Sequence, residues 1–165
     1  MAVTGRIGVG IDLRDARQSD SESVIAQISK AFGWDVAAGV AAGQANLIWQ
    51  DTSTILTAGV WSLDVAGTMT NQLGAAVFTV VKGIAIIAAD ANTTDVTVSR
   101  PAANGLPFLA AGSDALAPMG AGDGFAFWRK GAGITVTAGT GDLIYVTNAA
   151  GASADVTAIL VGLSE

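Results

Sequence analysis

The stretch ITVTAGTGDLIYVTNAAGASADVTAILVGL, residues 134–163, holds three apolar segments separated by glycine-rich turns. The segments are Ile134–Thr137, Leu143–Thr147 and Ala154–Leu163. They are rich in Val, Thr and Ile, which suit the pleated, half-buried surface of a β-strand. In Ala154–Leu163 both faces of an extended strand are apolar, which predicts a strand buried on both sides. Such a strand is either central in a sheet or covered by another subunit.

The same pattern continues toward the N-terminus of this stretch. Turn residues recur about every 8–12 residues, which is the spacing of an all-β sandwich or barrel. The three prolines all fall within residues 101–118, where we expect a long ordered loop. The remaining predicted strands are Ala45–Gln50, Thr54–Thr57, Val60–Val65, Ala75–Val80, Lys82–Ala88, Asp95–Ser99, Phe108–Ala110 and Gly124–Arg129.

A short α-helix is predicted over about residues 20–32. Ser19 and Glu22 fit the N-cap and N3 positions of a capping box. Gly33 is a natural helix stop. Apolar residues then recur at three- and four-residue spacing and would form one stripe that docks the helix: Val24, Ile25, Ile28 and Phe32.

The charge distribution divides the chain into an arm and a body. Residues 1–35 hold nine of the 22 charged side chains, and the other 130 residues hold 13. Residues 1–18 alternate at Ile7, Val9 and Ile11 but contain several glycines, so they are predicted to be an extended arm. We therefore expect an N-terminal arm and helix over residues 1–36 and a β-sandwich body over 37–165.

The arm carries three arginines interleaved with aspartates, and two interpretations remain open. One is a solvated tail. The other is a docking arm that becomes ordered on a partner surface, with arginine forming bidentate pairs with carboxylates. The candidate docking residues are Arg6, Arg14 and Arg17.

Composition excludes several function classes. The chain has no His and no Cys, so it cannot form a Ser-His-Asp triad, a thiolate nucleophile or a structural zinc site. We predict no enzymatic activity, no cofactor and no metal site. The net charge of −6, with only three lysines, argues against nucleic acid as a partner. The longest strongly apolar stretch, 83–89, is too short to span a membrane, and the first residues contain no secretory signal.

Two residue types leave narrower alternatives open. Most of the aspartates fall at predicted turns, where Asp hydrogen-bonds its own backbone, although a glycosidase pair or an ion at a subunit interface remains conceivable. The four tryptophans are expected to pack in a core or interface. A sugar-stacking platform made by Trp61 or Trp128 is the alternative for them.

Motifs in the body carry a resemblance to a known group of proteins. They are GQANLIWQDTSTILTAGVWSLDVAGTMTNQLG (43–74), FTVVKGIAII (78–87), VTAGTGDLIYVTN (136–148) and VTAILVGLS (156–164). In these segments the chain resembles small structural proteins of tailed bacteriophages, the head decoration (cement) and head-fibre proteins. The resemblance covers roughly three quarters of the chain and leaves the first 42 residues outside it.

The resemblance implies a jelly-roll-like antiparallel sandwich that assembles as a homotrimer on the major capsid protein, at the outer surface of the virion head. Such a protein is made in the host cytoplasm and reinforces the assembled shell. A tail-tube, fibre or spike component is the first alternative, and a carbohydrate-binding β-sandwich module is the second. The candidate oligomer contacts are Val156, Ile159, Leu160 and Val161.

Overall fold

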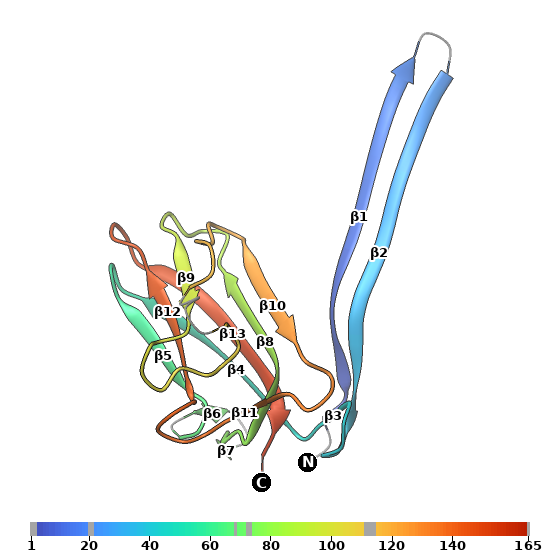
Figure 1. Ribbon diagram of the computed structural model, residues 1–165. Coiled ribbons are helices and arrows are strands. Elements are labelled where there is room, and N and C mark those ends of the chain that lie inside the picture. Colours follow the sequence, from blue (N-terminus) through green and yellow to red (C-terminus); the bar gives the residue numbers. More distant parts are fainter. Residues whose placement is uncertain (1–2, 20–21, 68, 72–73, 111–114, 165) are drawn as a thin grey trace.

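The strand with two apolar faces, β13 (Ala154–Leu163), lies at the centre of a five-stranded antiparallel sheet (Figure 1). This computed structural model describes residues 3–19, 22–67, 69–71, 74–110 and 115–164. In it, β13 pairs with β8 (Val80–Ala88) on one side and with β4 (Leu47–Ile55) on the other. β10 (Gly124–Trp128) and β11 (Ile134–Thr135) both pair with β8 and complete the sheet. The prediction of a central strand is confirmed.

A second sheet shares its core with the first. Its order is β5 (Val60–Asp64), β12 (Leu143–Asn148), β9 (Val96–Ser99), and both pairs are antiparallel. Alternate residues of β13 are buried and belong to one apolar cluster with Leu63, Val98, Ile144 and Val146 of this sheet. The protein is therefore mainly β, with several antiparallel sheets, and its described residues contain no helix. We call the part from β4 to β13 the body.

Several strand boundaries differ from those predicted. Thr54–Thr57 does not form a separate strand, because β4 runs without a break through Ile55. Phe108–Ala110 is not a strand but part of an irregular loop, which is tied to the core by buried Leu106 and Phe108. Between β5 and β8, two short strands, β6 (Thr70–Asn71) and β7 (Gly74–Ala75), pair as a small separate sheet.

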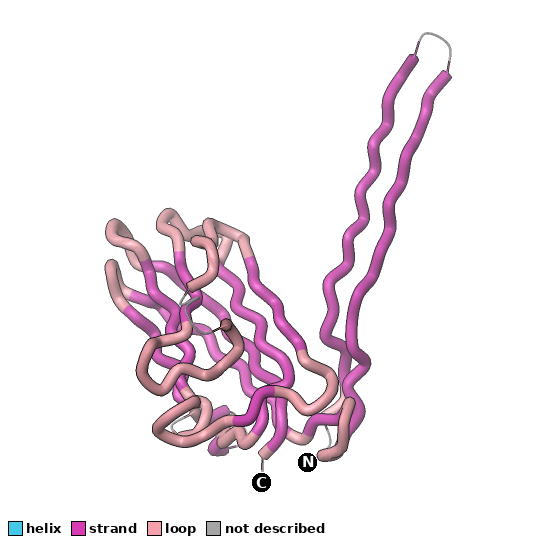
Figure 2. The backbone as a smooth tube through the Cα atoms, viewed as in Figure 1, coloured by secondary structure: helices cyan, strands magenta, loops and turns pink. Residues whose placement is uncertain are grey.

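The N-terminal segment forms a long antiparallel hairpin, and the predicted helix over residues 20–32 is wrong. β1 (Gly5–Ser19) pairs with β2 (Glu22–Ala38) along its whole length. Residues 20 and 21, the expected first helical turn, lie outside the described residues. The hairpin leaves the body beside β3 (Gln44–Ala45), which pairs parallel with the end of β2, and projects away from it (Figures 1 and 2). We call the β1–β2 hairpin the arm.

The error has a physical reason, because four-residue spacing also fits a strand. Residues four apart on a strand lie on the same face, since side chains alternate with a period of two. β1 has apolar residues at alternate positions, and the register places Val9 opposite Phe32 and Leu13 opposite Ile28. Cross-strand pairing of this kind outweighs a local capping signal. From Val24 to Val36 the alternate positions of β2 are Val24, Ala26, Ile28, Lys30, Phe32, Trp34 and Val36, and within this range only Lys30 is not apolar.

A buried asparagine holds the turns at one end of the body together. Asn148 is 1% exposed, and its Nδ2 lies within 2.8–3.1 Å of the carbonyl oxygens of Ile55, Leu56 and Ala152. Its Oδ1 accepts a hydrogen bond of 2.8 Å from the Thr94 hydroxyl. One side chain thereby connects three separate loops, because its amide lies between backbone carbonyls of two loops and the Thr94 hydroxyl of the third.

We expect Asn148→Ala to lower the free energy of unfolding by about 3 kcal/mol, because the variant loses several hydrogen bonds of a buried amide, each of which contributes roughly 0.5–1.5 kcal/mol. Urea denaturation followed by far-UV circular dichroism measures the change. Asn46→Ala is the matched control, since Asn46 is half-buried and its side chain hydrogen-bonds Ser164 near the end of β13. A loss in Asn148→Ala no larger than in this control would contradict the assigned role.

Candidate docking and oligomer surfaces

The arm is anchored to the body by an apolar cluster at its base. Trp34 is 1% exposed, and its indole Nε1 donates a hydrogen bond of 3.1 Å to the carbonyl oxygen of Gly43. Ile7 and Trp128 pack against the same cluster and are half-buried. The buried members of this base cluster are Val3, Trp34, Val36, Ala45 and Val161. β1, β2 and β3 thus meet the outer side of β13 in one apolar contact.

The base of the arm contacts the five-stranded sheet at a glycine. A Cβ atom built on Gly83 of β8 would lie 2.8 Å from Cδ1 of Ile7, which is closer than such atoms normally approach. Gly83 is opposite Val161 of β13 and Trp128 of β10, so these three residues form one row across the sheet. A glycine inside an apolar strand commonly marks a close approach, and this signal was available in the sequence.

A buried lysine on the core side of the same contact ties down the segment between β2 and β3. Lys82 is 2% exposed, and its Nζ donates hydrogen bonds of 3.0 and 2.8 Å to the carbonyl oxygens of Ala41 and Gln44. Burial lowers the pKa of the Lys82 ammonium, because the charged form loses hydration. Sequence reasoning missed both Lys82 and Gly83 as anchors of the arm.

The three predicted docking arginines lie on β1, but not on one face. The register places Arg6 opposite Asp35, Arg14 opposite Gln27 and Arg17 opposite Val24. Because faces alternate along a strand, Arg6 and Arg14 share one face and Arg17 belongs to the other. Arg6 Nε lies 3.8 Å from Asp35 Oδ1, and both side chains are largely exposed, so this ion pair contributes little to stability.

The four predicted oligomer contacts also divide between two faces of β13. Val156 and Leu160 are fully buried in the body's own core. Val161 is 5% exposed and belongs to the base cluster beneath the arm. Ile159 is half-buried on the outer face, so it is the member of this set that has side-chain surface available to a partner.

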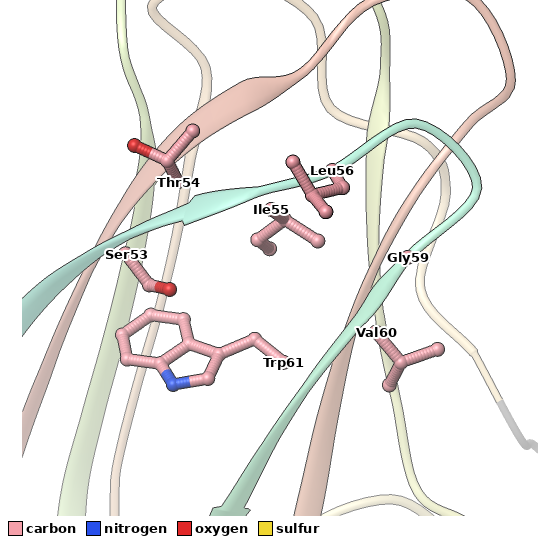
Figure 3. Close-up of a pocket in the computed structure, with 7 residues that line it drawn as sticks. All are labelled: Ser53, Thr54, Ile55, Leu56, Gly59, Val60 and Trp61. Carbon is pink, nitrogen blue, oxygen red and sulfur yellow. The ribbon is translucent and has the colours of Figure 1, made fainter.

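An open pocket of about 240 Å³ lies between β4 and β5. Figure 3 shows the Trp61 indole close to Ser53, with Ile55 and Leu56 nearby. The Trp61 ring also packs on buried Trp49, with ring centroids 6.2 Å apart. The pocket offers an aromatic face and hydroxyl groups and has no titratable side chain in its lining, which is Ser53, Thr54, Ile55, Leu56, Gly59, Val60 and Trp61.

Several aspartates of the body hydrogen-bond their own turns, as their positions predicted, whereas Asp155 lies in β13 and accepts from the Thr54 hydroxyl. Asp64 Oδ1 accepts from the Ala66 amide at 3.1 Å, and Asp123 Oδ2 accepts from the Gly120 amide at 2.8 Å. Asp142 is buried and accepts from the Gly139 amide. Within the described ranges, no three His, Cys, Asp or Glu residues gather closely enough to hold a metal ion.

Comparison with protein-family models, with curated proteins and with solved structures finds no match to this chain. The part of the chain that the structure describes contains no helix that could cross a membrane. Function therefore has to be argued from the arm, its anchor and the faces of the sheets.

We expect Gly83→Val to displace the base of the arm while the body stays folded, because the added side chain would occupy the place of Ile7. Hydrogen exchange measured by mass spectrometry should show faster exchange in residues 3–8 and 31–38, with β12 and β13 still protected. Gly131→Val is the control, since a Cβ atom there meets nothing within 4 Å. Unchanged protection at the arm base in Gly83→Val would disprove the anchor.

Proposed function

We propose that this protein is a non-enzymatic structural protein of a tailed-bacteriophage virion, which decorates the outer surface of the assembled head and stabilises it as a homotrimer. In this proposal the body is a jelly-roll-like sandwich, and the arm reaches a neighbouring subunit or the major capsid protein. The observation that carries the proposal is the arm, whose strands Gly5–Ser19 and Glu22–Ala38 project beyond the body (Figure 1). A projecting hairpin gives a small body a contact with a second surface.

The energetics of such a protein favour an oligomer with arms. Each arm makes a weak contact by itself, but contacts that are linked in one particle raise each other's effective concentration, so their combined affinity is much higher. A protein that binds only the assembled shell stabilises that shell by mass action. The resemblance of the body motifs to head decoration and head-fibre proteins points to the same role.

We expect the triple substitution Arg6→Glu, Arg14→Glu and Arg17→Glu to weaken capsid binding about tenfold or more, because hydrogen bonds to charged groups contribute roughly 1.5–3 kcal/mol each. The measurement is co-sedimentation of the purified protein with shells assembled from the major capsid protein of the same phage.

The control for this experiment is Arg129→Glu with Lys130→Glu, which reverses charge in the loop after β10 and leaves the arm unchanged. Equal binding by the triple variant and the wild type would count against the docking arginines. Binding to purified tails but not to shells would favour the alternative of a tail-tube, fibre or spike component.

A carbohydrate-binding module is the second candidate, and the pocket at Trp61 favours it. The structure distinguishes between the two tryptophans considered for a sugar platform, because Trp128 packs against the base cluster whereas Trp61 lines an open pocket. The Ser53 hydroxyl borders that pocket and can donate to a sugar, whereas the Thr54 hydroxyl already donates to Asp155 Oδ1 and can only accept.

If the capsid proposal holds, titration with oligosaccharides should leave the intrinsic tryptophan fluorescence unchanged, because no sugar then occupies the pocket. A saturable change that is lost in Trp61→Phe and retained in Trp128→Phe would establish the module instead. Phenylalanine keeps the ring's apolar packing on Trp49, so loss of signal would not simply report unfolding.

A further inference from the structure

The arm has one apolar face, which we define by the register. Ile7, Val9 and Leu13 of β1 lie opposite Trp34, Phe32 and Ile28 of β2, and opposite residues of an antiparallel pair share a face. We call these six positions the apolar arm face, and the pair of Ile11 and the charged Lys30 lies on the same face between Val9–Phe32 and Leu13–Ile28. The other face carries small and polar residues at its proximal positions, where Gly8 lies opposite Gly33 and Asp12 lies opposite Ser29. The arm is therefore amphipathic over its proximal two thirds.

The base of this face already has a partner inside the chain. Ile7 and Trp34 contact the row formed by Val161, Gly83 and Trp128 across the five-stranded sheet. The structure thus contains one example of how the apolar arm face is recognised. Its partner is a flat, uncharged row on the outer face of this sheet.

Two more rows of the same kind continue along the outer face. The next row is Ile159, Ala85 and Ala126, and the one after it is Thr157, Ile87 and Gly124. Ile87 is 44% exposed, Ala126 is exposed and Ile159 is half-buried, and neither row contains a charge. We call these six residues the open sheet rows.

The distal part of the arm stands apart from the open sheet rows of the same chain (Figure 1). Figure 1 shows the distal part of the hairpin well separated from β8, β10 and β13. An isolated two-stranded ribbon is at best marginally stable in water, so its apolar face needs a cover. The open sheet rows are continuous with the row that the base of the arm contacts in the same chain.

We propose that the distal apolar arm face of one protomer lies on the open sheet rows of a second copy of this chain. The second copy supplies both missing surfaces at once, in continuity with the contact made at the arm base. This assignment deepens the homo-oligomer part of the proposed function and rests on that part. Its tests need no capsid, so self-association and capsid binding can fail independently.

The matched pair Ile28→Glu and Ile25→Glu tests the arm, because the two isoleucines are on the same strand and on opposite faces. Ile28 is opposite Leu13 on the apolar arm face, whereas Ile25 is opposite Ala16 on the other face. Sedimentation velocity across a concentration series should show association weakened about 30-fold or more in Ile28→Glu, the size of effect expected at an interface hot spot. Ile25→Glu should associate like the wild type.

A second pair tests the sheet. Ile87→Glu should weaken association by a similar factor, and Val77→Glu, an equally exposed residue outside the five-stranded sheet, should not. Far-UV circular dichroism and urea midpoints close to those of the wild type would show that all four variants are folded.

Chemical crosslinking identifies which surfaces meet. The chain has no cysteine, so mixing an Ile28→Cys variant with an Ile87→Cys variant and adding a short bismaleimide should give a mixed crosslinked dimer. Crosslinks only between two Ile28→Cys chains would show arm-to-arm contact and overturn the proposal. A wild-type protein that stays monomeric at tens of micromolar, or equal effects of Ile25→Glu and Ile28→Glu, would also overturn it.

Discussion

The position of β13 between β8 and β4 is the constraint on which the other contacts depend. Because faces alternate along a strand, β13 sends Ala154, Val156, Ala158 and Leu160 into the core shared with the second sheet. The intervening residues face outward, and among them Val161 receives the base of the arm. One ten-residue strand thus supplies both the core of the body and the outer face. A shift of its register by one residue would exchange the two sets.

The sequence predicted the body better than the arm, and the difference is physical. Strands β13 and β12 are marked by β-branched residues and β10 by aromatic residues, and all three are bounded by turns, so the information that defines them is local. The arm depends on pairing between residues up to 31 positions apart, from Gly5 opposite Val36 to Ser19 opposite Glu22. The capping pattern at Ser19 and Glu22 is local, and it predicted a helix that the long-range pairing overrides.

The candidate surfaces were predictable only in outline. Composition ruled out His and Cys chemistry, and the concentration of charge in residues 1–35 indicated that this segment differs from the body. The sequence could not show that the side chains of Val156 and Leu160 pack in the chain's own core, since both faces of their strand are apolar. Nor could it reveal that Lys82 and Gly83 hold the base of the arm, because each depends on a segment more than 35 residues away.

The contact that we propose between copies constrains the assembly by its symmetry. It joins the arm of one protomer to the sheet of the next, so it is heterologous: two different patches meet, and the pair of copies still has one arm and one sheet unused. Such contacts either close into a ring or continue as a filament. Within each chain the first sheet row is occupied by that chain's own Ile7 and Trp34, which leaves the second and third rows as the landing site for another arm. The incoming arm is thereby confined to one region of the sheet. The contact therefore fixes the rotation between neighbouring copies. A ring that closes after three copies is the homotrimer of the proposed function, and in it every apolar arm face and every set of open sheet rows is covered.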